Sequence, residues 1–212
     1  MKIINTIGKY IGVKNSVTNP LELREGVRKA YSSAATDPEG KHPFPVGRRF
    51  AESIGYPETL LDELPDIASE SFAGVSNVSV FAEIPKGSIV LDLGCGTGLD
   101  SLIASLKTGR TGRVVGVDFS LSMVQRAREA GFQSDRGNMD FYCAAAEKLP
   151  ISDDTADVIL VNGLFNLNPF RDQIFKELAR VVKPGGVVYG AELILTKPQS
   201  HKKNCSLTEW FS

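Results

Sequence analysis

Residues 89–98, with the sequence IVLDLGCGTG, are the part of the chain that most constrains its fold. A short apolar run that ends at a glycine-rich turn is typical of a buried parallel strand. Glycines at alternate positions let the backbone turn sharply and approach a ligand closely. The helical pattern that follows directs unpaired N–H groups and a positive dipole end at the turn. The stretch therefore predicts a strand, a turn and a helix start that together bind a small molecule.

Strand and helix patterns alternate along the chain after this point. We expect strands over residues 88–93, 112–118, 139–143, 157–161 and 187–195, and helices over 98–106, 120–130 and 171–181. The segment 183–186 (KPGG) predicts a helix stop and a turn before the last strand. This alternation indicates right-handed βαβ units, so we expect an α/β fold with a doubly wound, mostly parallel sheet. Such sheets bind ligands at the carboxyl ends of their strands, where Asp92 and Asp118 are expected.

The chain divides into three segments whose sequence patterns differ. Residues 1–85 combine helix and loop signals without a clear strand and are expected to form an N-terminal helical cap. Within it, Asn19 and Pro20 predict a helix start because a capping side chain precedes proline at the first helical position. Residues 86–196 are the expected core, and residues 197–212 form a polar C-terminal tail.

Composition excludes several classes of protein. With 24 basic and 25 acidic residues, the chain has no charge excess that favours nucleic acid or an anionic membrane as partner. Its apolar runs are shorter than the roughly 18 residues that span a bilayer, and no secretory signal is recognisable. The three cysteines form no CxxC pair, so we expect neither a disulfide framework nor a metal site, and a cytoplasmic location.

Two kinds of cofactor compete for the glycine turn. A dinucleotide-binding turn has the pattern GxGxxG, but its third glycine position is occupied here by Leu99, and glycine stands at Gly98. An acid such as Asp92 is also foreign to that pattern, because a pyrophosphate avoids a nearby carboxylate. The pattern DxGxGxG instead resembles motif I of the class I S-adenosylmethionine-dependent methyltransferases. This resemblance implies a Rossmann-like methyltransferase fold and S-adenosylmethionine as cofactor, whose ammonium an acidic region attracts.

Further motifs extend the resemblance over residues 87–195. Asp118 ends the second expected strand, where it would accept hydrogen bonds from the ribose hydroxyls, and Phe119 and Met123 would flank the adenine. Residues 144–150 (AAAEKLP) resemble the GDAExLP segment that lines the adenine in these enzymes. Ala144 replaces its glycine and Ala145 replaces its acid, which often meets the adenine amine, so a backbone group or Glu147 would take that place. Cys95 is interpreted as a turn residue and not as a nucleophile. The expected cofactor site comprises Asp92, Gly94, Cys95, Gly96, Asp118, Phe119, Met123, Ala146, Glu147 and Asn162.

The N-terminal segment has a narrower resemblance, to the arsenite methyltransferases and their ubiquinone- and menaquinone-methylating relatives. It is carried by Tyr31-Ser32-Ser33, by Gly55-Tyr56-Pro57 and by residues 71–77, 98–100 and 162–167. Trivalent arsenic needs several thiolates, but Val75 and Gly163 stand at two expected cysteine positions and only Cys205 remains. Arsenite methylation is therefore disfavoured. The resemblance makes Tyr31 the candidate catalytic residue, with packing in the core as its alternative role.

Other expectations remain open on the residues alone. His42 and His201 are the only histidines that would supply a base, and Phe165 and Phe170 would wall either an acceptor pocket or the core. Methyltransferases of this class usually add two strands after the fifth. Here the sheet is short, is completed by another chain as in a homodimer, or belongs to a truncated chain. We expect methyl transfer to a small-molecule acceptor; the alternatives are a non-catalytic cofactor-binding or regulatory module and an NAD-type oxidoreductase.

Overall fold

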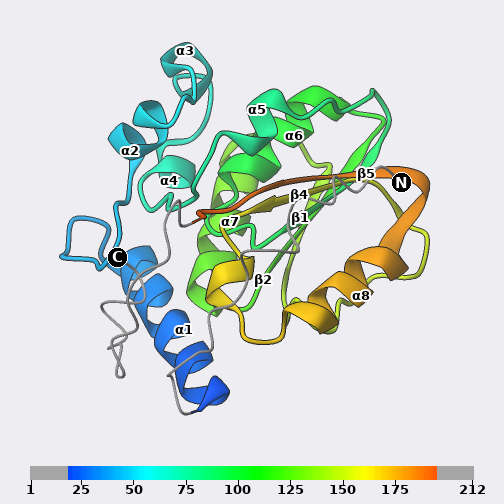
Figure 1. Ribbon diagram of the computed structural model, residues 1–212. Helices are drawn as coiled ribbons and strands as arrows, with labels where there is room; N and C mark the ends of the chain where they lie inside the picture. The colour runs from blue at the N-terminus through cyan, green and yellow to red at the C-terminus, as the bar shows by residue number, and fades with distance from the viewer. Residues whose placement is uncertain (1–18, 195–212) are drawn as a thin grey trace.

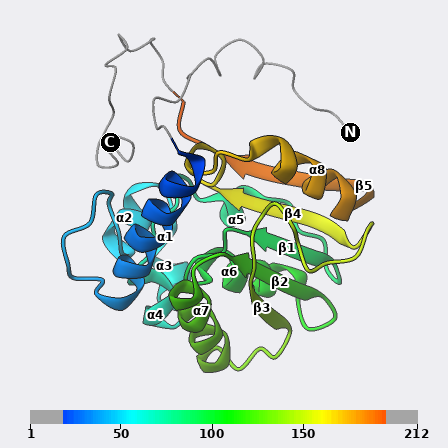
Figure 2. The same cartoon turned by 90° about the horizontal axis from the view of Figure 1, so that it is seen from below.

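A five-stranded sheet organises the structure, a computed structural model that describes residues 19–194. Its strand order is β3-β2-β1-β4-β5, and every neighbouring pair is parallel. Figure 2 shows the five strands side by side in this order. The strands are β1 (Ile89–Leu93), β2 (Arg113–Asp118), β3 (Met139–Cys143), β4 (Ala156–Asn162) and β5 (Val182–Ala191). The expected doubly wound parallel sheet is thereby confirmed.

Helices cover both faces of this sheet because its strands are apolar on both sides. In β1, Val90 packs among side chains of α5 (Val78–Phe81) and α6 (Leu99–Thr108). Leu91 and Leu93 point the opposite way and pack against α8 (Arg171–Val181). Figure 1 shows α5 and α6 on one side of the strands and α8 on the other. The helix α7 (Leu121–Gln133) lies between β2 and β3 in the chain and packs beside α6.

One long helix and several short ones precede the sheet and lie near the carboxyl ends of its strands (Figure 2). They are α1 (Pro20–Thr36), α2 (Arg48–Ser53), α3 (Glu58–Leu61) and α4 (Asp66–Ser69). The Asn19 side chain caps α1 by accepting a hydrogen bond from the Leu21 N–H, as the Asn19-Pro20 pair predicts. The last turn of α1 is held from two sides. The Ser71 hydroxyl donates to the Ala34 carbonyl at 2.8 Å, and Arg126 donates to the Ala35 carbonyl at 3.1 Å.

The last strand differs from its expected position. The segment 183–186, expected to be a turn, belongs to β5, which begins at Val182 directly after α8 and ends at Ala191. Pairing with β4 shifts register between Ala156 and Val158, so the strand accommodates the proline and glycines at an irregular position. The strand therefore starts five residues earlier than expected, and Leu195 lies outside the described residues.

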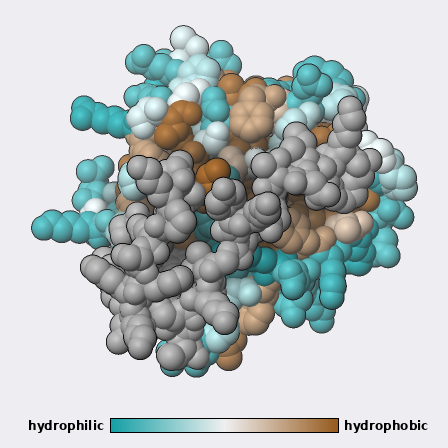
Figure 3. All heavy atoms as spheres, in the orientation of Figure 1, coloured by the Kyte–Doolittle hydropathy of each residue, from teal (hydrophilic) through white to brown (hydrophobic). Residues whose placement is uncertain are grey.

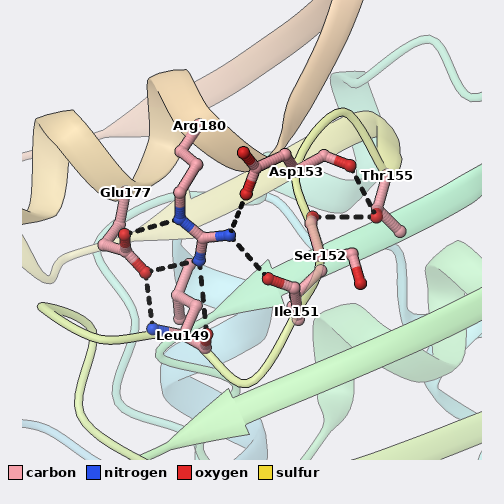
Figure 4. A network of polar contacts seen from close by, with 7 residues as sticks. All are labelled: Leu149, Ile151, Ser152, Asp153, Thr155, Glu177 and Arg180. Carbon is pink, nitrogen blue, oxygen red and sulfur yellow. Dashed lines mark hydrogen bonds and ion pairs between the residues drawn. The ribbon is translucent and has the colours of Figure 1, made fainter.

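The segment between β3 and β4, residues 144–155, contains no helix and is held in place by one arginine. Figure 4 shows Arg180 of α8 at the centre of this contact. Its guanidinium donates to the Ile151 and Leu149 carbonyls at 2.7 and 3.3 Å, and it pairs with Asp153 and Glu177. The same Glu177 accepts a hydrogen bond from the Leu149 N–H at 2.7 Å. The arginine thus ties residues 149–153 of this segment to α8.

Apolar side chains also reach the surface. Figure 3 shows hydrophilic residues around much of one face and separate hydrophobic patches among them. On the edge strand β5, Val187 and Val188 are 45% and 43% exposed, one on each side of the strand. Within residues 19–194, the helices are too short or too polar to cross a membrane.

Replacing Arg180 by glutamine should destabilise the fold without changing its topology. The substitution removes charge-assisted hydrogen bonds to two carbonyls and two carboxylates, so we expect the free energy of unfolding to fall by about 2 kcal/mol. Urea denaturation followed by circular dichroism measures this change. The control is Arg113→Gln, which removes an exposed pair with Asp140 and should cost less than about 1 kcal/mol. Equal losses in both variants would contradict the role given to Arg180.

Candidate functional site

A cavity lies at the carboxyl ends of β1, β2 and β4, beneath α1. Three residues one or two helical turns apart on α1 line it: Arg24, Val27 and Tyr31. The glycine turn after β1 lines it from the opposite side, together with residues that follow β2, β3 and β4. This is the edge of the sheet at which parallel α/β folds bind ligands. The sequence prediction of a site around the glycine turn therefore agrees with the position of the cavity.

The glycine turn adopts a backbone that other residues rarely take. Gly94, Gly96 and Gly98 all have positive φ, of 78°, 52° and 87°. A Cβ on Gly98 would lie 3.2 Å from the Ala127 Cβ, so this glycine lets α6 and α7 approach each other. A Cβ on Gly96 would meet no atom within 4 Å. The backbone at Gly96 therefore faces open space in the cavity, and a bound molecule can come into contact with it.

The Asp118 carboxylate is fixed at the end of β2 by two backbone groups. It accepts hydrogen bonds from the Gly96 N–H at 3.1 Å and from the Ser120 N–H at 2.8 Å. Burial raises the pKa of Asp118 to about 6, although both hydrogen bonds oppose the rise. The side chain is 8% exposed and lines the cavity. Asp118 is thus a rigid hydrogen-bond acceptor, ionised at neutral pH, in the expected position.

Asp92 does not line the cavity, in contrast to the expectation that it belongs to the binding surface. It points from β1 toward α6, where it accepts a hydrogen bond from the Ser101 hydroxyl at 2.6 Å. Burial raises the pKa of Asp92 to about 8, and the nearby Asp100 carboxylate contributes to the rise. The strand places it there because the side chain at position 92 faces the same side of the sheet as Val90. Asp92 would therefore influence a ligand only electrostatically, without contact.

Asp100, to which the sequence assigned no role, is the acid that lines the cavity beside the turn. The Tyr56 hydroxyl donates to its Oδ1 at 2.6 Å, and the Ser79 hydroxyl donates to the same oxygen. The Asn162 amide donates to Oδ2 at 2.9 Å. An acid in the first turn of a helix that carries an apolar face is the available signal, but the partners of Asp100 lie far away in the sequence.

Asn162, at the end of β4, holds a loop over the cavity. Its side-chain oxygen accepts hydrogen bonds from the Val75 and Ser76 N–H groups at 2.8 and 3.1 Å. Its amide group donates to the Ser76 carbonyl at 2.7 Å. Asn162 lines the cavity, as expected of a site residue, but most of its hydrogen-bonding groups are occupied by the protein. We conclude that it shapes the site through this loop.

Tyr31 lies in the cavity wall and also packs in a cluster, a position that is compatible with either of its two expected roles. Its ring stacks on Phe44 with centroids 4.6 Å apart and packs near Met123. Burial raises the pKa of the Tyr31 phenol, and the Asp118 carboxylate raises it further. The phenol therefore stays protonated at neutral pH. It can donate a hydrogen bond or contact a ligand, and it is unsuited to act as a base.

The remaining expected cofactor residues come together around the same cavity. Burial raises the pKa of the Cys95 thiol well above its ordinary value, which agrees with a turn residue and not with a nucleophile. Glu147 faces α1, where its Oε1 lies 3.8 Å from Arg24 and accepts a hydrogen bond from Asn168 at 3.1 Å. The other expected residues in the lining are Gly94, Phe119, Met123 and Ala146.

Several candidates lie elsewhere. His42 is absent from the described cavity lining, and its ring nitrogen lies 2.8 Å from the Asp37 carbonyl. Phe165 stacks on Phe175 of α8 with centroids 4.9 Å apart, and the cavity wall at this point is formed by Leu164 and Leu167. The 3-10 helix at Phe165–Leu167 produces this arrangement by turning Phe165 toward α8. His201 and Cys205 lie outside the described residues.

The two positions at which relatives were expected to carry cysteine lie against each other. Gly163 has a positive φ of 73°, and a Cβ built on it would lie 3.0 Å from the Val75 Cγ1. Side chains at these positions would therefore meet at the cavity wall, where Gly163 is exposed to the cavity. In this chain the contact is between a methyl group and a backbone, and it offers no sulfur to a soft metal or metalloid.

The buried Asp92 carboxyl should make stability depend on pH. In the unfolded chain it loses its proton near pH 4, whereas in the folded chain it does so near pH 8. The folded state binds more protons between these values, so Asp92 lowers stability progressively as pH rises through this window. We expect the difference between the Tm of Asp92→Asn and that of the wild type to shift in favour of the variant as the pH rises from about 5 to about 8. The control is Asp140→Asn in β3, whose Tm should differ from the wild-type Tm by the same amount at every pH in this range. A pH-independent difference for Asp92→Asn as well would refute the raised pKa of Asp92.

Comparisons with known proteins agree with this geometry. Residues 84–209 match a family model described as a methyltransferase domain. An arsenite methyltransferase of Halobacterium salinarum is 30% identical over 85% of this chain and 49% of its own length. A demethylmenaquinone methyltransferase of Listeria monocytogenes is 36% identical over 49% of this chain and 44% of its own length. The chain thus spans about half the length of the curated relatives it matches.

A solved structure shows the same relationship. The arsenic(III) S-adenosylmethionine methyltransferase of Chlamydomonas reinhardtii aligns with a TM-score of 0.59 and 28% identity. The alignment covers 63% of this chain and 47% of that chain. The family model alone covers more than half of the chain, including the whole sheet and the glycine turn. The chain therefore belongs to the methyltransferase domain family, among the class I S-adenosylmethionine-dependent methyltransferases.

Proposed function

We propose that this chain transfers a methyl group from S-adenosylmethionine to a small-molecule acceptor. The observation that carries the proposal is the charge of the cavity. Among the described residues, three carboxylates line it (Asp100, Asp118 and Glu147), against one guanidinium, that of Arg24. A negative cavity attracts a ligand that carries a sulfonium and an ammonium group. It disfavours a pyrophosphate, and with it the NAD-type oxidoreductase.

The residues present fit this cofactor in two further respects. The open space in front of Gly96 leaves room for a ligand directly over the turn. The Glu147 Oε2 atom is buried and accepts no hydrogen bond from the described residues, which is costly unless a bound molecule donates one. When bound, S-adenosylmethionine supplies a methyl group on an electrophilic sulfur. The chain's own residues need only bind the partners, orient them and exclude water.

Individual roles follow from position. Asp118 offers its fixed carboxylate to the ribose hydroxyls, and Phe119, Met123 and Ala146 form the wall for the adenine. Gly94, Cys95 and Gly96 contribute backbone surface. Tyr31 covers this region from α1 with a phenol that remains protonated. Asp100 supplies negative charge near the turn.

The acceptor is proposed to be a small molecule other than arsenite. The curated relatives are named for arsenite and for demethylmenaquinone, and both names describe small acceptors. The contact between Val75 and Gly163 provides no sulfur where arsenic would need it. The cavity wall around it consists of apolar side chains, among them Val27, Phe72, Leu164 and Leu167.

Calorimetric titration tests the cofactor. We expect S-adenosylmethionine and S-adenosylhomocysteine to bind and NAD not to bind. Binding of NAD alone would overturn the proposal. Release of S-adenosylhomocysteine with an acceptor then separates an enzyme from a non-catalytic cofactor-binding module, because the module would bind the cofactor without turnover.

Asp118→Ala should weaken the binding of S-adenosylhomocysteine by more than about tenfold, since the hydrogen bonds to the ribose would be lost. The matched control is Asp140→Ala, in the neighbouring strand but exposed and paired with Arg113. Calorimetry on both variants gives the comparison. An Asp118→Ala protein that binds as tightly as the wild type would refute the ribose assignment.

The affinity for S-adenosylhomocysteine should also depend on pH through Asp118. Its carboxylate accepts two hydrogen bonds from a ribose only when ionised, and its pKa is about 6 without ligand. Affinity should therefore fall as pH drops below about 6, by up to about tenfold per pH unit. Titrations between about pH 5 and pH 7 measure the slope. Asp118→Asn, which cannot ionise, should bind weakly and without this slope; the same slope in that variant would assign it to another group.

A further inference from the structure

Three buried carboxyl groups surround the glycine turn. Asp92, Asp100 and Asp118 are 2%, 5% and 8% exposed, and they come from β1, the first turn of α6 and the end of β2. Within residues 19–194, no lysine, arginine or histidine forms an ion pair with any of them. Ionising all three without a cation is unfavourable, because buried charges of one sign repel each other and have lost their water.

The three groups differ in the hydrogen bonds that favour their ionised forms. Asp100 accepts hydrogen bonds from the side chains of three residues, and Asp118 accepts them from two backbone N–H groups. The donors to Asp92 in the described structure belong to one residue, Ser101, whose hydroxyl lies 2.6 Å from its Oδ2. Asp92 is also the most deeply buried of the three. The proton therefore stays on Asp92, in agreement with its pKa of about 8, which burial and the Asp100 carboxylate raise.

The other groups around Asp92 bring no charge that would ionise it. The Tyr56 phenol and the Cys95 thiol both face it, and burial raises the pKa of each, so both are neutral near pH 7. The neighbouring strands oppose Asp92 with uncharged residues, and α5 contains no titratable side chain. Lys107, in the last turn of α6, donates to two backbone carbonyls at 2.6 and 2.9 Å. It lies six residues after Ser101, about 9 Å along the helix.

Asp100 and Asp118 connect Asp92 to the cavity. Both line the cavity, whereas Asp92 lies behind its wall, and both carboxylates raise the pKa of Asp92. A positive charge in the cavity lies next to the same two carboxylates and acts on Asp92 in the opposite direction. S-adenosylmethionine brings two such charges, on its sulfonium and its ammonium group.

We propose that Asp92 releases its proton when S-adenosylmethionine binds and takes one up again when the sulfonium has become a thioether. The inference rests on the proposed function. The proton leaves to the solvent as the cation arrives, and it returns from the solvent after methyl transfer has left the sulfur neutral. Because the ionised Asp92 stabilises a bound cation, it favours S-adenosylmethionine over S-adenosylhomocysteine, increasingly so as the pH rises toward 8.

Calorimetry in two buffers tests proton release. The full chain is titrated at about pH 7, where Asp118 is mostly ionised, in phosphate and in Tris, whose ionisation enthalpies differ. The difference in binding enthalpy gives the number of protons released. With S-adenosylmethionine we expect the wild type to release at least about half a proton more than Asp92→Asn. This excess should be smaller with S-adenosylhomocysteine and absent with 5′-methylthioadenosine, which has neither cation.

Affinity provides a second measurement. The ratio of the S-adenosylmethionine affinity of the wild type to that of Asp92→Asn should grow by about tenfold between about pH 5.5 and pH 8. The matched control is Asp140→Asn, the same change at an exposed position, which should release as many protons as the wild type.

Contrary outcomes separate this inference from the proposed function. Equal proton release by the wild type and Asp92→Asn would overturn the inference, and so would an equal excess with 5′-methylthioadenosine. If Asp92→Asn does not fold, carbon-13 NMR of the wild-type aspartates decides: a carboxyl protonated at pH 7 should ionise when S-adenosylmethionine binds, and unchanged protonation of every aspartate would overturn the inference. A wild-type chain that binds neither S-adenosylmethionine nor S-adenosylhomocysteine would overturn the proposed function itself.

Discussion

The site depends on the hydrogen bond that the Asn162 amide donates to the Asp100 carboxylate. Asp100 lies in the first turn of α6 and Asn162 ends β4, so this contact joins the helix that follows the glycine turn to the end of β4. Tyr56 donates a hydrogen bond to the same carboxylate, and the Ser76 carbonyl accepts one from the same amide. These bonds fix the N-terminal segment against the sheet. The buried polar groups are hydrogen-bond partners of one another, so the loss of one leaves the others without a partner. The cap and the core therefore share one polar network.

Local patterns were sufficient to predict the sheet, the glycine turn and the acid at the end of β2. Those features depend on near neighbours: apolar runs, the conformational freedom of Gly94 and Gly96, and the capping of α1 by Asn19. Most of the expected site residues also line the cavity, because parallel strands bring their carboxyl ends to one edge. The family resemblance supplied the roles, which geometry alone would not have assigned.

The structure differs from the sequence predictions where contacts between residues distant in the sequence determine the position of a side chain or strand. Strand alternation turned Asp92 toward α6, and the acid that lines the cavity beside the turn is Asp100, whose partners are up to 62 residues away. The segment 183–186 looked like a turn because proline and glycine favour one, but pairing with β4 drew it into β5. For Phe165 the sequence left the choice between cavity wall and core open, and its stacking on Phe175 of α8, which periodicity does not reveal, decides for the core. Tertiary pairing overrode local preference in each case.

The strand order has a consequence for how the chain folds. Strands β1, β2 and β3 are consecutive neighbours, and so are β4 and β5, whereas β1 and β4 pair only after an intervening βαβ segment, with Val90 opposite Val158. Closing that long loop is entropically costly, so the two groups of strands can form before the seam between them. The cavity spans this seam. We therefore expect the binding site to be completed by the pairing of β1 with β4, the slowest pairing in the sheet. A ligand that contacts both groups of strands should stabilise this pairing most.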